Sequence, residues 1–132
     1  MIDIPFEPRP TSDATCVLVV EDEFLIRTMV SDALRDAGLA VIEAIDADEA
    51  MRVLQSGVAI DLMFSDVRMP GSMDGLALLR NCTELFPDLP VIMTSGHLAA
   101  SDAITTGARR FLPKPYLPDE AIAAVKFELG QR

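Results

Sequence analysis

Four short apolar runs, each leading into a polar residue, constrain the fold of this chain more than any other feature. They are residues 17–20 before Glu21, 62–65 before Asp66, 91–93 before Thr94, and 111–112, which precede Lys114. Runs of this length are typical of buried strands in a parallel sheet. Because ligands bind at the carboxyl ends of such strands, the sequence predicts one site at one edge of one sheet.

Helical patterns alternate with the strand patterns along the chain. We expect strands at residues 16–20, 39–42, 62–65, 91–93 and 108–112. We expect a first helix at about 26–37 and a second at 47–54, which begins with a capping box of Asp46 and Glu49. A third helix should begin after the cap Asp74, and a short fourth helix should lie within 98–107 with Ser101 as its cap. The last helix should run from Pro118 to about 129. Parallel strands need crossover connections, so this alternation predicts an α/β fold with helices on both faces of the sheet. The natural candidate is the flavodoxin-like (βα)5 doubly wound sheet with strand order 2-1-3-4-5, which places Glu21 and Asp22 beside Asp66.

Composition limits the class of protein. The chain has 132 residues, half of them hydrophobic, which is enough for one domain with a substantial core. We expect a flexible N-terminal arm at residues 1–14, because it is proline-containing and aperiodic, and one folded domain at 15–132. A net charge of −10 argues against nucleic-acid binding. No signal peptide and no apolar run of roughly 18 residues are present, so we expect a cytoplasmic protein with free thiols at Cys16 and Cys82 and no membrane contact.

Carboxylates at neighbouring strand ends indicate a cation site. Like charges held close together disfavour ionisation unless a cation compensates for them. Oxygen ligands suit Mg²⁺, which takes one or two carboxylates and keeps several waters. We expect Asp22 and Asp66 to be ligands, the backbone carbonyl of Arg68 to be a third, and Glu21 to act through a bound water.

Thr94 and Lys114 add groups that recognise phosphate. A lysine ammonium is a mobile positive charge suited to a phosphoryl oxygen, and a threonine hydroxyl can donate a hydrogen bond to one. Together with a metal and a carboxylate, they predict phosphoryl transfer onto Asp66. Asp66 would be the nucleophile, Lys114 a charge clamp, and Thr94 the group that senses the product.

Each of these residues also has a plainer interpretation. Glu21 and Asp22 match an acidic first helical turn, Asp66 an Asx turn, Thr94 a helix cap, and Lys114 a solvated surface lysine. Turn chemistry does not explain all of them at strand ends, and this coincidence favours the phosphoryl-transfer hypothesis.

Five motifs in this order and spacing resemble the receiver domain of two-component response regulators. They are residues 17–23 (VLVVEDE), 65–70 (SDVRMP), 74–75 (DG), 91–96 (VIMTSG) and 111–116 (FLPKPY). The resemblance implies that Asp66 accepts a phosphoryl group from a phosphohistidine on a histidine kinase or a histidine phosphotransfer protein. It also implies that Thr94 is the switch hydroxyl, that Phe111 stands at the switch-aromatic position, and that the Lys114–Pro115 bond is cis.

The sequence departs from the common form of this family in three places. The acidic pair is Glu21–Asp22 rather than two aspartates, and the loop at residues 69–74 is one residue longer, as in receivers found on hybrid sensor histidine kinases. The fourth helix is short, on a face that the family uses for partners.

We therefore expect a phosphoacceptor signalling switch that does not turn over a free substrate. The sequence ends soon after Tyr116, so we expect output through a downstream protein target, through a homodimer, or through action as a phosphate sink. The alternatives are a receiver-fold binding module that works without phosphate, and a magnesium-dependent phosphatase. Arg68 counts against the phosphatase, because those enzymes commonly place a second carboxylate two residues after the nucleophile.

Overall fold

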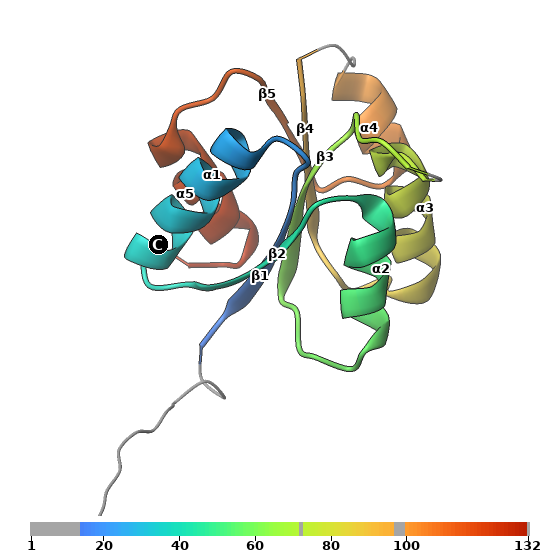
Figure 1. Cartoon of the computed structure of the whole chain (residues 1–132), viewed down its shortest axis with the longest axis horizontal. Coiled ribbons are helices and arrows are strands. Elements are labelled where there is room, and N and C mark those ends of the chain that lie inside the picture. Colours follow the sequence, from blue (N-terminus) through green and yellow to red (C-terminus); the bar gives the residue numbers. More distant parts are fainter. Residues whose placement is uncertain (1–13, 72, 97–99, 132) are drawn as a thin grey trace, which may run out of the picture.

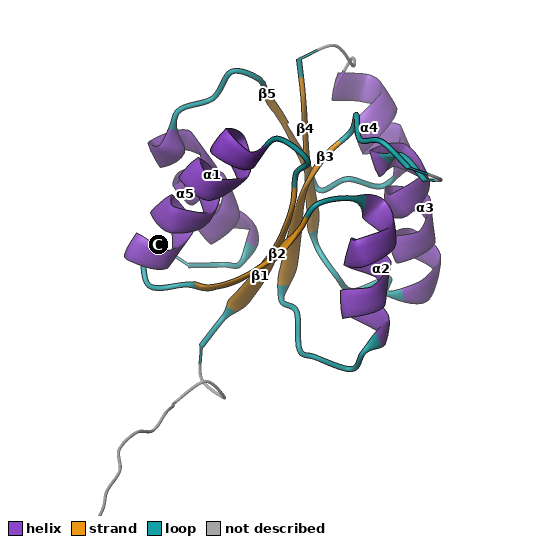
Figure 2. Ribbon diagram, viewed as in Figure 1, coloured by secondary structure: helices purple, strands orange, loops and turns teal. Residues whose placement is uncertain are grey.

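The computed structural model describes residues 14–71, 73–96 and 100–131, and strands and helices alternate through all of them (Figures 1 and 2). The five strands are β1 Cys16–Val20, β2 Ala40–Ala44, β3 Leu62–Asp66, β4 Val91–Ser95 and β5 Arg110–Pro113. The five helices are α1 Phe24–Asp36, α2 Ala47–Gln55, α3 Gly75–Leu85, α4 Ala100–Thr106 and α5 Pro118–Glu128. No helix in the described part of the chain is long and apolar enough to cross a membrane.

All strand pairs are parallel, and the sheet order is β2-β1-β3-β4-β5. This confirms the predicted flavodoxin-like topology. Helices α1 and α5 cover one face of the sheet, and α2, α3 and α4 cover the other (Figure 1). The register pairs Asp66 at the end of β3 with Thr94 on β4, so the two residues lie side by side at the carboxyl edge.

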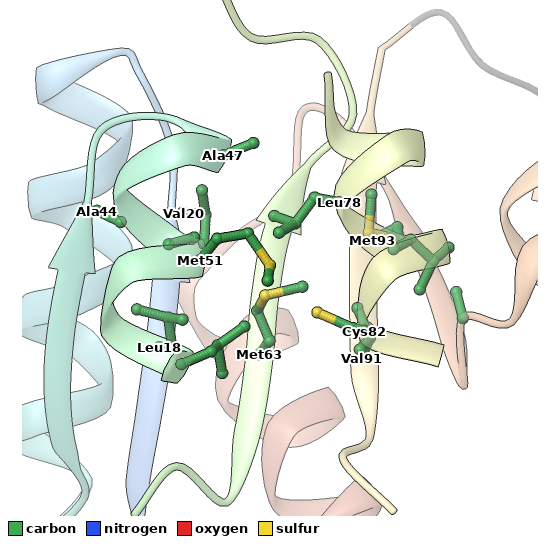
Figure 3. Close-up of a cluster of buried hydrophobic side chains, with 14 of the residues drawn as sticks. Leu18, Val20, Ala44, Ala47, Met51, Met63, Leu78, Cys82, Val91 and Met93 are labelled. Carbon is green, nitrogen blue, oxygen red and sulfur yellow. The ribbon is translucent and has the colours of Figure 1, made fainter. Parts of the chain in front are cut away.

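The core lies on both faces because strand side chains alternate between them. In β1, Leu18 and Val20 point toward α2 and α3, whereas Val17 and Val19 belong to the cluster under α1 and α5. Figure 3 shows the first of these clusters, in which methionine side chains fill the space between the sheet and the helices. The rigid two-sided core fixes the strand ends that carry the site.

Two predicted helix caps are present. The Asp46 carboxylate accepts a hydrogen bond from the Glu49 N–H at 2.8 Å, and Glu49 accepts one from the Ile45 N–H at 2.8 Å. Asp74 accepts a hydrogen bond from the Ala77 N–H at 2.9 Å and so starts α3. These caps satisfy N–H groups that a helix start leaves unpaired.

The predicted bounds of two strands were wrong at their first residues. The Leu39 N–H donates to the Leu34 carbonyl, which makes Leu39 part of the end of α1, so β2 begins one residue later. In the same way, the Ala108 N–H donates to the Ala103 carbonyl at the end of α4, and β5 begins at Arg110.

Three smaller predictions on caps, thiols and the arm had different outcomes. Ser101 lies inside α4 and is therefore not its cap, although the helix is short as predicted. Both cysteines are free, and Cys82 is buried but Cys16 only partly so. The predicted arm at residues 1–14 lies outside the described residues except for Ala14.

Candidate functional site

The turn between β1 and α1 holds the acidic pair in place. The Glu21 N–H donates to the Ala44 carbonyl at 3.0 Å, and the Glu21 carbonyl accepts from Arg27 Nη1 at 2.9 Å. The Glu21 carboxylate also accepts from the Glu23 N–H at 3.1 Å. Glu21 is consequently buried and fixed, and the adjacent Asp22 is exposed at the mouth of the site.

Asp66 ends β3 with a buried carboxylate. The backbone N–H groups of Arg68 and Val67 lower the pKa of this carboxyl and so oppose part of the effect of burial. The start of α3 packs directly against the same segment, since a Cβ atom on Gly75 would clash with the Asp66 carbonyl oxygen and with the backbone of Val67. Only glycine fits there, so Gly75 allows α3 to begin against the backbone of the candidate acceptor.

Lys114 follows β5 and reaches both buried carboxylates. Its Nζ lies 3.0 Å from Glu21 Oε1 and 3.2 Å from Asp66 Oδ2. Its backbone N–H donates to the Ser95 carbonyl at 3.0 Å, and the Lys114–Pro115 peptide bond is cis, as the resemblance implied. The ammonium group therefore lies between two chain segments that are far apart in sequence.

Thr94 lies beside Asp66, and its hydroxyl group makes no hydrogen bond within the described residues. The residue is 1% exposed, and among the described residues Thr94 Oγ1 is one of two buried side-chain oxygens without a hydrogen-bond partner. Its carbonyl accepts from the Val67 N–H at 2.9 Å, which ties β4 to the loop after Asp66. A buried hydroxyl without a partner is costly, so this oxygen marks a place where a further polar group would fit.

The site is electrostatically unbalanced because burial and ion pairing oppose each other. Burial raises the pKa of Asp66 and of Glu21 above their ordinary values, although the nearby Lys114 ammonium lowers both. Burial alone would lower the pKa of Lys114, but its hydrogen bond to Glu21 and the charge of Asp66 outweigh this and raise it. One ammonium thus compensates incompletely for two buried carboxylates, and a second cation would be favourable here.

The structure brings the predicted site residues together. Oxygen atoms of Glu21, Asp22 and Asp66 all lie within 4.8 Å of one another, a spacing that could hold a metal ion. A pocket of about 210 Å³ opens beside them, lined by Asp22, Glu23, Asp66, Arg68, Ser95, Gly96 and Lys114. Phe111 is instead partly buried against the core cluster under α2 to α4.

Sequence reasoning assigned no role to three residues that shape this site. The first is Gly75, which was identified only as part of the motif at residues 74–75. The second is Tyr116, which is buried and packs edge-on against Phe64 with ring centroids 5.7 Å apart. The third is Arg27, a cation in the first turn of α1.

Comparison with known proteins agrees with this geometry. The family model described as the response regulator receiver domain matches residues 17–126. This chain belongs to that family. Receiver domains are the phosphoacceptor signalling modules of two-component regulatory systems, and they interact with histidine kinases or phosphotransfer proteins.

Relatives of this receiver domain occur in longer regulators and kinases. The DNA-binding transcriptional regulator NtrC of Salmonella typhimurium is 42% identical over 113 residues, which cover 83% of this chain and 24% of NtrC. The sensor kinase CckA of Brucella abortus is 36% identical over 121 residues, which cover 87% of this chain and 12% of CckA. The chain thus spans about a quarter or less of these relatives.

A solved structure supports the same assignment. The crystal structure of the receiver domain of NtrX from Brucella abortus superposes with a TM-score of 0.81 at 38% identity, covering 88% of this chain and 99% of the NtrX receiver. The similarity therefore extends over most of this chain.

Proposed function

We propose that residues 15–132 form a phosphorylation switch in which Asp66 accepts a phosphoryl group from a phosphohistidine. The observation that carries this proposal is that Lys114 Nζ lies 3.2 Å from Asp66 Oδ2. Asp66 in turn pairs with Thr94 on the neighbouring strand, and the Thr94 hydroxyl is buried without a hydrogen-bond partner among the described residues. An ammonium and a hydroxyl beside one carboxylate match the needs of a phosphoryl group, which presents charged oxygens in more than one direction.

Mg²⁺ fits the donor set of this pocket. Glu21, Asp22 and Asp66 present three carboxylates within 4.8 Å, and hard oxygen donors are the ligands that Mg²⁺ prefers. In this proposal Asp22 and Asp66 bind the ion directly, Glu21 acts through water, and the carbonyl of Arg68 completes the protein ligands. The bound ion would supply positive charge to offset the phosphoryl oxygens.

The side chains of this chain position the reacting groups. One Oδ atom of Asp66 forms a bond to phosphorus while the bond from phosphorus to the donor imidazole nitrogen breaks, and the imidazole keeps the electron pair. Lys114 stabilises the negative charge on the transferred group and on Asp66. Thr94 then donates a hydrogen bond to a phosphoryl oxygen, which couples β4 to the phosphorylated state. We infer no turnover of a free substrate.

An apolar surface adjoins the pocket. Three large apolar side chains at the starts of α1 and α5 are strongly exposed: Phe24 is 65%, Leu25 80% and Leu117 67% exposed. An apolar hollow of about 360 Å³ continues from Lys114 and is lined by Ile26, Met29, Gly96, Lys114, Pro115 and Tyr116. We propose that this surface binds the helices that carry the phosphohistidine of a histidine kinase or phosphotransfer protein, in the cytoplasm.

Phosphorylation by a small donor tests the proposal. The protein is incubated with Mg²⁺ and acetyl phosphate, and intact mass is measured with and without a chelator. We expect one base-labile phosphoryl addition that needs Mg²⁺ and that Asp66→Asn abolishes. Asp88→Asn, an exposed aspartate in the loop before β4, serves as the matched control and should be labelled normally.

The same experiment separates the rival functions. Labelling that survives in Asp66→Asn would place the acceptor elsewhere. Absence of both labelling and saturable Mg²⁺ binding in the wild-type protein would favour a receiver-fold module that works without phosphate.

A further inference from the structure

Arg27 makes three contacts that converge on the turn of the acidic pair. Its Nη1 donates to the Glu21 carbonyl at 2.9 Å, and its Nε donates to Glu43 Oε1 on β2 at 3.1 Å. Its guanidinium lies 5.6 Å from the centroid of the Phe24 ring. The side chain is only 13% exposed, so these contacts are largely shielded from water.

The position of this arginine needs an explanation. The Arg27 N–H donates to the Glu23 carbonyl, which places Arg27 in the first turn of α1. A cation there is disfavoured by the helix dipole, which prefers negative charge at a helix start. Its charge also lies near a site that binds a cation in the proposed function. Charge balance therefore does not explain a cation at this position, whereas a role in fixing the geometry of the turn does.

The contacts of Arg27 restrict the conformation of the turn between β1 and α1. The Glu21 N–H is held by Ala44 of β2, and its carbonyl is held by Arg27, whose other end is anchored to the same strand through Glu43. Both ends of one peptide segment are thus tied to β2. Asp22 follows this segment immediately, so the direction of its exposed carboxylate depends on it.

We propose that Arg27 is a positioning residue that orients Asp22 and Glu21 for Mg²⁺ binding, by clamping the Glu21 carbonyl to Glu43. The inference rests on the proposed Mg²⁺-dependent function of the pocket. Outer partners that orient metal ligands contribute strongly to affinity even though they do not touch the ion. Arg27 belongs to an ion-pair group with Glu43, Arg35 and Asp32 that has no net charge, so the electrostatic effect of this group on the ion is small compared with the effect of Arg27 on geometry.

Arg35 provides a matched control within the same ion-pair group. It lies in the last turn of α1, and its Nη2 is 3.1 Å from Glu43 Oε2, the other oxygen of the same carboxylate. It also pairs with Asp32 at 3.6 Å. Arg35→Ala therefore removes an ion pair with Glu43 and a positive charge from α1, but it leaves the Glu21 carbonyl contact intact.

The test is a Mg²⁺ titration followed by amide NMR shifts of residues 21–23 in the wild type, Arg27→Ala and Arg35→Ala. We expect Arg27→Ala to bind Mg²⁺ about tenfold more weakly, at the lower end of the loss that removing an outer-shell partner causes. Arg35→Ala should bind like the wild type. Arg27→Lys, which keeps the charge but cannot make both donor contacts, should show an intermediate affinity and keeps the test usable if Arg27→Ala is poorly folded.

A second measurement does not depend on the metal. Hydrogen exchange of the Glu23 amide, which donates to Glu21 Oε2, should be faster in metal-free Arg27→Ala and unchanged in Arg35→Ala. Unchanged or tighter Mg²⁺ binding in Arg27→Ala, or equal losses in both arginine variants, would overturn the inference. Lack of Mg²⁺ binding by the wild type would instead refute the proposed function itself.

Discussion

Replacing Thr94 by valine should stabilise this receiver domain while impairing its switch. Thr94 Oγ1 is buried without a hydrogen-bond partner among the described residues, so the folded state bears an uncompensated desolvation cost. Removing such a cost contributes about 1 kcal/mol or more, and a buried methyl adds a further ~0.8 kcal/mol at most. We expect the free energy of unfolding to rise by about 1–2 kcal/mol, and the melting temperature by roughly 4–8 °C for a domain of this size.

Urea denaturation of the metal-free, unphosphorylated protein measures this gain. Ser31→Ala is the control, because Ser31 Oγ in α1 is the other buried oxygen without a partner in the described chain. Both variants should be more stable than the wild type, with unchanged denaturant slopes. A loss of stability in Thr94→Val would mean that the hydroxyl has a stabilising partner in the folded protein, and would refute the reasoning.

The switch provides the second half of the prediction. Valine cannot donate a hydrogen bond to a phosphoryl oxygen, so phosphorylated Thr94→Val should show smaller amide shift changes in β4 and β5 than the phosphorylated wild type. Ser31→Ala should show the full changes. Equal shift changes in Thr94→Val and the wild type would mean that the hydroxyl does not sense the phosphoryl group.

Two further predictions follow from the packing and the charge of the site. Gly75→Ala should destabilise the fold by about 3 kcal/mol in urea denaturation, because the new Cβ would meet backbone atoms of the Asp66 segment. Gly96→Ala is the control: its Cβ would lie 3.8 Å from Lys114 Cβ, so stability should change by less than about 0.5 kcal/mol. Equal effects of the two substitutions would contradict the steric account. Burial raises the pKa of Asp66, so between its ordinary and its raised pKa the folded state binds more protons than the unfolded state, and stability falls as the pH rises through this window. Asp66→Asn should therefore stabilise the metal-free protein at neutral pH, and the gain should shrink as the pH falls from the raised pKa of Asp66 towards its ordinary value of about 4. A gain that is absent at neutral pH, or that Asp88→Asn reproduces, would contradict this assignment.

The order of strands and helices was predictable because each element carries its own local pattern. Apolar runs that lead into Glu21, Asp66, Thr94 and Lys114 identify strands and place these residues at one edge, whatever the details of packing. The caps at Asp46 and Asp74 are equally local, since a cap involves residues three apart.

Element bounds were less predictable because neighbouring segments compete for the same backbone groups. Leu39 is an apolar residue next to the apolar run of β2, but its N–H donates to the Leu34 carbonyl at the end of α1. At the other end, β2 extends to Ala44 because the register pairs that residue with Val20. Such choices depend on the partner strand and not on the residue itself.

The tertiary structure alone decided which side chains meet at the site. Lys114 is 93 residues from Glu21 and yet bonds to it as well as to Asp66. Arg27 reaches Glu43 and the Glu21 carbonyl because helix α1 lies against β2 at one particular distance. The sequence by itself determined the fold class and the residue types at the strand ends, because periodicity and burial are encoded locally. It did not determine these contacts, since they depend on strand register, helix placement and side-chain rotamers that are set only when the whole core packs.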